Sequence, residues 1–220
     1  MTRKLTRIQS LIAGGAFALA GIGGTTAALV THDQPAAAET STAQAAVQAV
    51  DANPVAQAGA PTDEQLHPVA ITGTQKTFTP SHEQLANAKA IVDTAKQMGL
   101  SPRAWTIAVA TSLQESNLIN VGNLGAANDH DSRGLFQQRI GTGGWGTEAQ
   151  IMDPDHATKA FLERLIKIDG WQNMPLTKAA QKVQVSAYPD HYAKHETQAA
   201  DIINALYGNG PYADAAKNIK

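Results

Sequence analysis

The feature that most constrains this chain is an apolar run at residues 105–110, preceded by Ser101 and Pro102. Proline is favoured at the first position of a helix, so the sequence predicts a helix that begins at Pro102. From residue 104 to residue 110 this helix is mostly apolar on every side, which is typical of a helix in the interior of a domain. The rest of the domain is therefore expected to pack around it.

A glutamate follows this run at position 115, where a buried charge would be costly. On a helix from Pro102 it shares a face with the small residues Ala108 and Thr111. Apolar neighbours and the negative end of the helix dipole would both favour the protonated form of the Glu115 carboxyl. An acid that stays protonated near neutral pH can donate a proton in catalysis. The alternative is a surface glutamate whose carboxylate faces water.

Residues 1–38 have the composition of an export signal. A basic start precedes an apolar stretch at 8–30 that is rich in small residues, and three alanines at 36–38 suit a signal peptidase. We expect cleavage after Ala38. The alternative is an uncleaved anchor, because the apolar stretch is about long enough to span a bilayer. The sequence thus predicts a secreted or cell-wall protein, held at the membrane only if residues 8–30 are retained.

Two further segments are predicted to lie outside the folded domain. Residues 39–80 are dominated by Ala, Gln, Thr and Pro, and such a segment buries too little surface to offset the entropy of ordering it. We expect 39–80 to be a disordered linker and 208–220 to be a flexible tail. The domain then spans 81–207.

Composition argues against two classes of function. A formal net charge of −2 does not suit nucleic acid, whose binding needs a clustered basic face. The chain has no cysteine, so disulfides, thiol catalysis and Cys-based metal sites are excluded. A neutral or mixed-charge ligand fits better.

Helical spacing of apolar residues recurs beyond the first helix, which predicts an all-α fold class. The further helices are expected at 81–98, 153–169, 177–183 and about 189–206. Ser81 and Gln84 match a capping box, and Asp153-Pro154 repeats the device of a cap followed by proline. Residues 120–150 are irregular and rich in glycine, and a loop of this length in a compact domain is usually either functional or a sign of a wrong assignment. Some of it is expected to form a short hairpin.

Two short motifs carry a resemblance to a known family. Gln-Glu-Ser-Asn at 114–117 is followed by Ser-Arg-Gly-Leu-Phe-Gln at 132–137. This pair resembles the soluble lytic transglycosylases and goose-type lysozymes, in which a helix ending in Glu-Ser leads to a Gly-Leu-x-Gln segment that lines the same cleft. The resemblance covers roughly 101–137, and the chain is similar to exported actinobacterial proteins with a lysozyme-like domain. It implies a lysozyme-like helical domain with a glycine-rich cleft segment.

The resemblance also implies roles for single residues. Glu115 matches the catalytic glutamate, and Ser116 matches the residue beside it, which is expected to bind substrate. Gly134, Leu135 and Gln137 match the cleft motif.

One part of the family pattern is incomplete in this chain. The families usually have an Ala-Tyr-Asn-Ala-Gly stretch whose tyrosine hydrogen-bonds near the acid. Tyr188 is the matching tyrosine here, but Pro189 and Asp190 follow it, and the Asn and Gly are absent.

By this resemblance the protein would be a peptidoglycan lytic transglycosylase that needs no cofactor. It would cleave the β-1,4 bond between N-acetylmuramic acid and N-acetylglucosamine in glycan strands, with Glu115 as general acid and base. In these enzymes the muramyl 6-hydroxyl attacks internally and leaves a 1,6-anhydro end. The alternative is a catalytically weak or inactive wall-binding or assembly module, which the missing Asn and Gly favour.

A hydrolase would instead need a second carboxylate. Asp129 and Asp131 lie in the loop and could supply it, but turn formation at 128–132 explains them as well. Trp145 lies among glycines, where an indole could either stack on a sugar ring or fold back over the core. Gln137 and Gln138 offer amides that suit N-acetyl groups, and one of the pair is expected to face solvent.

The remaining polar candidates favour simpler roles. His191 and His195 are four residues apart and could share a helical face, but no third ligand or His-Glu-x-x-His motif accompanies them, so no metal is expected. Arg133 and Arg139 flank the cleft motif and could meet a peptide carboxylate, although a solvated role is simpler. His156 is expected at a helix surface.

Overall fold

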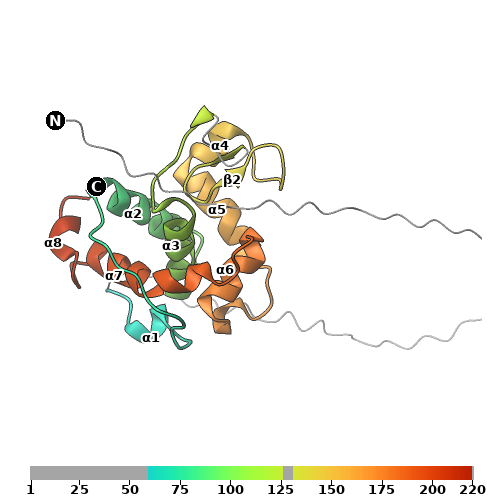
Figure 1. The fold of residues 1–220 in the computed structure, drawn as a ribbon. Coiled ribbons are helices and arrows are strands. Elements are labelled where there is room, and N and C mark those ends of the chain that lie inside the picture. Colours follow the sequence, from blue (N-terminus) through green and yellow to red (C-terminus); the bar gives the residue numbers. More distant parts are fainter. Residues whose placement is uncertain (1–58, 126–130, 220) are drawn as a thin grey trace, which may run out of the picture.

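A computed structural model describes residues 59–125 and 131–219. Within them the chain is mainly helical, which confirms the all-α class. The elements in chain order are α1 (Asp63–Leu66), α2 (His82–Gln97), α3 (Pro102–Ser116), β1 (Ser132–Arg133), β2 (Gln138–Arg139), α4 (Glu148–Met152), α5 (Pro154–Leu165), η2 (Trp171–Asn173), α6 (Leu176–Gln184), η3 (His191–His195), α7 (Glu196–Leu206) and α8 (Ala213–Ala216). Figure 1 shows α3 in the middle, between α2 and α7 on one side and α5 and α6 on the other.

Helix α3 is the core of the domain, as its sequence predicts. Every residue from Pro102 to Leu113 is buried. The small side chains on this helix let its neighbours approach closely, and α1, α2, α5, α6 and α7 all pack against it. Asn117 then takes a left-handed conformation (φ 54°) and ends the helix.

The predicted helix starts at α2 and α5 are confirmed. The Ser81 hydroxyl accepts a hydrogen bond from the Gln84 backbone amide, and the Ser81 backbone amide donates one to the side-chain oxygen of Gln84. Asp153 caps α5 with its carboxylate, and Pro154 follows at the first position. Helix α5 ends at Leu165, earlier than the glycine at position 170 suggested.

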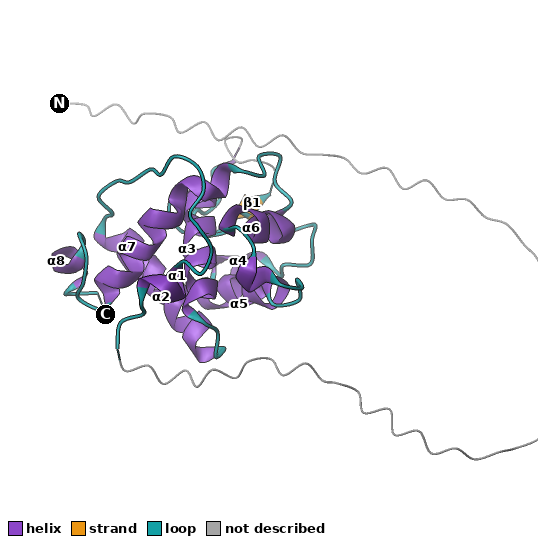
Figure 2. Cartoon of the chain, turned by 90° about the horizontal axis from the view of Figure 1, so that it is seen from below, coloured by secondary structure: helices purple, strands orange, loops and turns teal. Residues whose placement is uncertain are grey.

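The last predicted helix is two elements in the structure. Residues 191–195 form the 3-10 helix η3, and the α-helix α7 begins at Glu196. Short 3-10 segments, which turn more tightly than an α-helix, are common at the start of α-helices. The glycine-rich segment contains a two-stranded antiparallel hairpin, β1 with β2, and the short helix α4 (Figure 2).

The linker expected at 39–80 extends too far, because its last part packs on the domain. Leu66 of α1 is completely buried. The Lys76 amide donates to the Lys194 carbonyl, and the Gln198 side chain exchanges two hydrogen bonds with the backbone of Phe78. A few apolar anchors and backbone hydrogen bonds thus order a segment of otherwise polar composition. Residues 39–58 of this prediction lie outside the described residues.

The tail expected at 208–220 is also structured in part. It contains α8, whose Ala216 is buried, and Tyr212 packs against the same core. The segment has few apolar residues, but those in and next to α8 pack together on the core. The average composition of the segment does not show this clustering.

The predicted signal or anchor at 1–38 lies outside the described residues. In the part of the chain that the structure describes, no helix combines the length and the apolar character needed to cross a membrane.

A buried ion pair joins α3 to α7. The Arg103 guanidinium donates to the Glu196 carboxylate at 2.6 Å, and both side chains are almost fully buried. Arg103 also donates to the carbonyls of Leu66 and Met174, while His67 lies 3.4 Å from the same Glu196 oxygen. These contacts attach α1 and the chain before α6 to the first turn of α3. No local sequence pattern indicates this cluster, because its members are far apart in the chain.

We expect Glu196→Ala to lower the free energy of unfolding by about 3–5 kcal/mol, because it leaves the buried Arg103 charge without its partner. Urea denaturation of the full chain measures this loss. Asp93→Ala is the matched control, since Asp93 pairs with Lys89 on α2 and both side chains are partly exposed. Loss of an exposed pair costs about 0–1 kcal/mol. Equal losses in the two variants would show that the buried pair does not hold these elements together.

Candidate functional site

Glu115 lies in the last turn of α3 and is half-buried. The end of this helix is fixed against α2 by two side-chain amides. Gln84 donates to the Asn117 carbonyl at 2.7 Å, and Asn87 donates to the Leu118 carbonyl at 2.8 Å. Leu118 itself is fully buried. The backbone that carries Glu115 is therefore held by its own helix and by the neighbouring one.

Tyr192 of η3 meets the glutamate directly. Its hydroxyl donates to Glu115 Oε1 at 2.7 Å, and the whole side chain is buried. Burial, and then the neighbouring Glu115 charge, raise the pKa of the Tyr192 hydroxyl above its usual value. Tyr192 therefore stays neutral and keeps its proton to donate. This contact fixes one carboxyl oxygen of Glu115 in place.

The expected tyrosine partner of the acid, Tyr188, does not occupy this position. Its ring is 38% exposed and stacks on His191, with 4.7 Å between ring centroids and 8° between planes. The family motif aligns with Tyr188 because Ala187 precedes it. The turn into η3 instead places Tyr192, four residues later, beside Glu115. Tyr192 is thus a site residue that the sequence analysis missed. Its only signal was its place among the apolar residues of the last predicted helix.

The two motifs that carry the resemblance touch in the structure. The hydroxyls of Ser112 and Ser116 both donate to the Leu135 carbonyl, at 3.0 and 2.8 Å. Gly134 has φ 74°, and a Cβ there would collide with the Ile151 carbonyl, so the segment can pass this close only with glycine. Ser116, expected to bind substrate, instead uses its hydroxyl to fix the Gly-Leu-Phe-Gln turn beside the end of α3.

The two glutamines of the motif have different environments. Gln137 is half-buried at φ 48°, and its amide donates to the Gly134 carbonyl at 3.1 Å. Gln138 is only 2% exposed, and its amide donates to the Ala157 carbonyl. Its side chain thus joins the hairpin to α5, and the substrate-binding role of Gln138 stays a prediction. Gln137 remains a candidate.

Charged residues of the loop hold the hairpin together. Asp131 accepts hydrogen bonds from Arg139 Nε at 2.8 Å and from the Gly141 amide at 2.7 Å, and these lower the pKa of its carboxyl to about 2. This is the turn-forming role that the sequence offered as the alternative to catalysis. Arg133 is buried and lies 3.5 Å from Glu148, so it is not a solvated flank of the motif. Asp129 lies outside the described residues.

Trp145 is part of the hydrophobic core rather than an open sugar platform. Its side chain is 9% exposed, and the Arg164 guanidinium lies 3.3 Å from the ring centroid. Arg164 also donates to the Gly143 and Gly144 carbonyls, and His156 Nε2 lies 3.2 Å from the Trp145 carbonyl. The stacking position that a sugar would need is thus filled by Arg164. His156, expected at a plain helix surface, helps to hold this loop.

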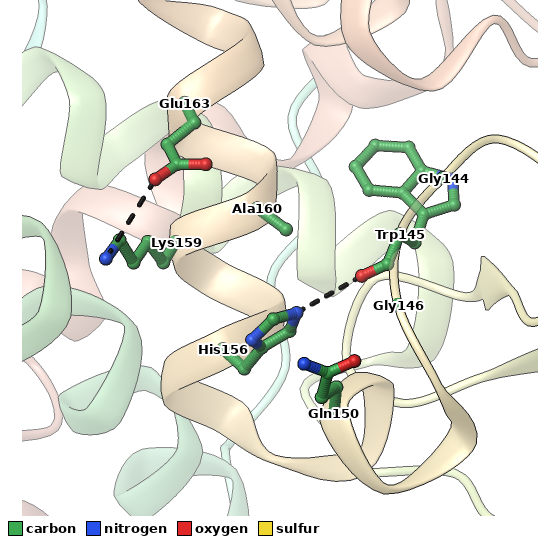
Figure 3. Close-up of a pocket in the computed structure, with 8 residues that line it drawn as sticks. All are labelled: Gly144, Trp145, Gly146, Gln150, His156, Lys159, Ala160 and Glu163. Atoms are coloured by element: carbon green, nitrogen blue, oxygen red, sulfur yellow. Dashed lines mark hydrogen bonds and ion pairs between the residues drawn. The ribbon is translucent and has the colours of Figure 1, made fainter.

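A pocket of about 330 Å³ lies between this glycine loop and α5 (Figure 3). Figure 3 shows His156, Lys159 and Glu163 along one helix, with the His156 ring turned toward the loop that carries Trp145. Lys159 and Glu163 form an exposed pair at 4.0 Å. Neither Glu115 nor Tyr192 lines this pocket, so it is not part of the candidate site at the end of α3.

The two histidines once considered as metal ligands differ in environment. His191 is exposed, whereas His195 is 7% exposed, and its Nε2 lies 3.3 Å from Gln114 Oε1. Burial, with the nearby Lys194 and Lys76 charges, lowers the pKa of His195 to about 4. Among residues 59–125 and 131–219, no group of three His, Cys, Asp or Glu side chains could hold a metal ion.

Comparison with known proteins adds no relative. A scan against protein-family models gives no match, and neither does a search of curated proteins.

We expect Trp145→Ala to lower the free energy of unfolding by about 3–5 kcal/mol, because it empties a core position. A thermal melt alongside urea denaturation measures the loss. Ile166→Ala is the control, since Ile166 is 44% exposed and a surface change of this kind alters stability by at most about 0.5 kcal/mol. A near-native melt combined with lost glycan binding would return Trp145 to a sugar site.

Stability should fall as the pH drops from 6.5 towards 4, because unfolded His195 gains a proton there while the folded side chain does not. The loss is about 1.4 kcal/mol per pH unit at most. Above pH 6.5 both states are neutral at this residue and it contributes no slope. Urea denaturation at pH 7 and pH 5 should show a smaller loss in His195→Gln than in the unmodified chain. His82→Gln, at the exposed start of α2, is the control, and an unchanged slope in His195→Gln would contradict this assignment.

Proposed function

We propose that this protein is a peptidoglycan lytic transglycosylase. It cleaves the β-1,4 bond between N-acetylmuramic acid and N-acetylglucosamine, and Glu115 is its general acid and base. The observation that carries the proposal is the hydrogen bond from the buried Tyr192 hydroxyl to Glu115. It gives a half-buried carboxyl at a helix end a fixed orientation, and proton transfer to a substrate oxygen requires such an orientation.

The reaction needs only one carboxyl group. Protonated Glu115 gives its proton to the oxygen that links the two sugars, and the bond from that oxygen to C1 of the muramyl residue breaks. The 6-hydroxyl oxygen of the same muramyl residue then bonds to C1, and its proton passes to the Glu115 carboxylate. The acid is restored, no water is consumed, and the product carries a 1,6-anhydro end.

The state of Asp131 supports internal attack over hydrolysis. A hydrolase of the usual type uses a second carboxylate as nucleophile or as base for water. Among the residues that the structure describes, Asp131 is the candidate for that role. Both of its carboxylate oxygens, however, accept hydrogen bonds within the hairpin, from Arg139 and Gly141. A carboxylate stabilised in this way is a weak base.

The contacts around the acid also support this assignment. Ser112 and Ser116 bring the Leu135 carbonyl to the end of α3, and Gln137 lies two residues further on. The Gln137 side chain retains an amide oxygen that suits the N–H of an N-acetyl group. The protein would then act on glycan strands outside the cell, in keeping with the export signal predicted at 1–38.

Glu115→Gln in the full chain should reduce release of soluble fragments from purified sacculi by about 10²–10⁴-fold, because the amide cannot donate the proton. The fold should persist, since the substitution changes one atom of a half-buried side chain. Glu163→Gln, which removes an exposed carboxylate of α5, is the control and should keep full activity. Unchanged release in a folded Glu115→Gln variant would end the proposal.

Mass analysis of the same digests identifies the reaction. Fragments with 1,6-anhydro ends are expected, whereas reducing ends would make the enzyme a hydrolase. Binding to sacculi without any release by the unmodified chain would instead support the wall-binding module. The departure from the family pattern after Tyr188 is the feature that favours this second function.

A further inference from the structure

The segment between α6 and η3 presents apolar and aromatic side chains to solution. Val185 is 71% exposed and Tyr188 is 38% exposed. Val185 also has φ 51°, a left-handed conformation that a β-branched residue adopts only under strain. In this conformation Val185 ends α6, and its amide donates to the Gln181 carbonyl at 2.8 Å, but its side chain gains no burial there. Strained residues of this kind cluster at sites of function, so the segment is a candidate binding surface.

Helix α6 holds this segment in one conformation. Gln181 Nε2 donates to the Ser186 carbonyl at 2.8 Å, and the Thr177 hydroxyl donates to the Pro189 carbonyl at 2.7 Å. Lys178 pairs with Asp190 at 3.0 Å. The exposed side chains are thus displayed on a backbone that is already ordered, which lowers the entropy lost on binding a ligand.

The Tyr188 ring has a defined orientation within this segment. One face stacks on the His191 ring, and the Tyr188 amide donates to the Ser186 hydroxyl at 3.1 Å. A stacked, partly exposed tyrosine offers an apolar ring and a polar hydroxyl together. The apolar face of a sugar ring and its flanking hydroxyl or acetamido groups match that combination.

The position of the segment links it to the candidate acid. His191 directly precedes Tyr192, whose hydroxyl contacts Glu115. At the other end, Gln184 Nε2 donates to the Phe136 carbonyl at 2.9 Å, within the motif that Ser116 also holds. The segment therefore connects both halves of the site. A polymer cut at Glu115 extends past the cleaved bond, and its neighbouring sugars need a surface of this kind.

We propose that Tyr188, stacked on His191 and flanked by Val185, is a binding platform for an N-acetylated aminosugar of the glycan strand, next to the bond that Glu115 cleaves. This inference rests on the proposed function, because it assigns a substrate subsite to the same site. It also gives Tyr188 a role other than contact with the acid.

Binding is measured in the full chain carrying Glu115→Gln, so that cleavage does not consume the ligand. Chitohexaose is titrated as a soluble probe, and purified sacculi are used in a sedimentation assay. Adding Tyr188→Ala should weaken chitohexaose binding by about tenfold, the loss of one aromatic stacking contact, while Tyr188→Phe should keep most of it. Ile166→Ala, which shortens an exposed apolar side chain directly after α5, is the matched control and should bind normally.

Val185→Asn provides an independent arm. Asparagine tolerates the left-handed conformation, so the variant should melt at or above the temperature of its parent. Loss of the apolar side chain should nevertheless weaken chitohexaose binding several-fold. If Tyr188→Ala proves unstable, this variant decides the matter. Unchanged binding in both folded variants overturns the platform.

The outcomes separate this inference from the proposed function. Cleavage of sacculi by the unmodified chain, with binding that ignores Tyr188 and Val185, leaves the function and overturns the platform. Binding that depends on these residues without any cleavage supports the platform and overturns the enzyme. Absence of both binding and cleavage overturns both.

Discussion

Burial of α3 on all sides is the constraint on which the rest of this structure depends. Twelve consecutive residues, from Pro102 to Leu113, have no open face, so the surrounding helices must enclose α3 completely. The helix can reach polar surroundings only at its two ends. Arg103 occupies the first end and Glu115 the second, and each meets an oxygen-bearing side chain from the η3–α7 segment.

The two ends are used differently. At the start, Arg103 and Glu196 form a nearly dry ion pair to which α1 adds a carbonyl and a histidine. Such a pair is costly to break, because removal of one partner leaves the other as an uncompensated buried charge. At the other end, Glu115 is half-buried and receives a hydrogen bond from a neutral phenol. The same chain segment thus secures the fold at one end of α3 and orients a carboxyl at the other.

The ordering of the glycine-rich segment follows from the same helix. Ser112 and Ser116, one turn apart on α3, converge on the Leu135 carbonyl and hold the motif turn against it. Asp131 and Arg139 close the hairpin beyond, and Arg164 and His156 fix the glycine loop that carries Trp145. A segment with little regular structure of its own is therefore fixed by side chains of α3 and α5. The candidate site depends on these contacts, because they fix the Gly-Leu-Phe-Gln turn in position beside the Glu115 carboxyl.

Local signals in the sequence predicted a large part of the fold. The cap at Ser81, the cap and proline at 153–154 and the proline at 102 each act within one turn of helix, so their effect is visible in a few adjacent residues. The apolar run at 105–110 predicted the buried helix, and the glutamate after this run indicated the candidate acid. The turn role of Asp131 was also among the predicted alternatives.

Only the tertiary structure decided which residues meet across the chain. Tyr192 contacts Glu115 from 77 positions away, and Arg103 meets Glu196 from 93 positions away. No local pattern encodes such a pairing, since it depends on how helices pack. For the same reason, the sequence could not tell that Gln138 is buried, that Arg164 covers Trp145, or that Leu66 and Phe78 pack on the domain. Periodicity and capping act through neighbours in sequence, whereas side-chain partners are set by neighbours in space.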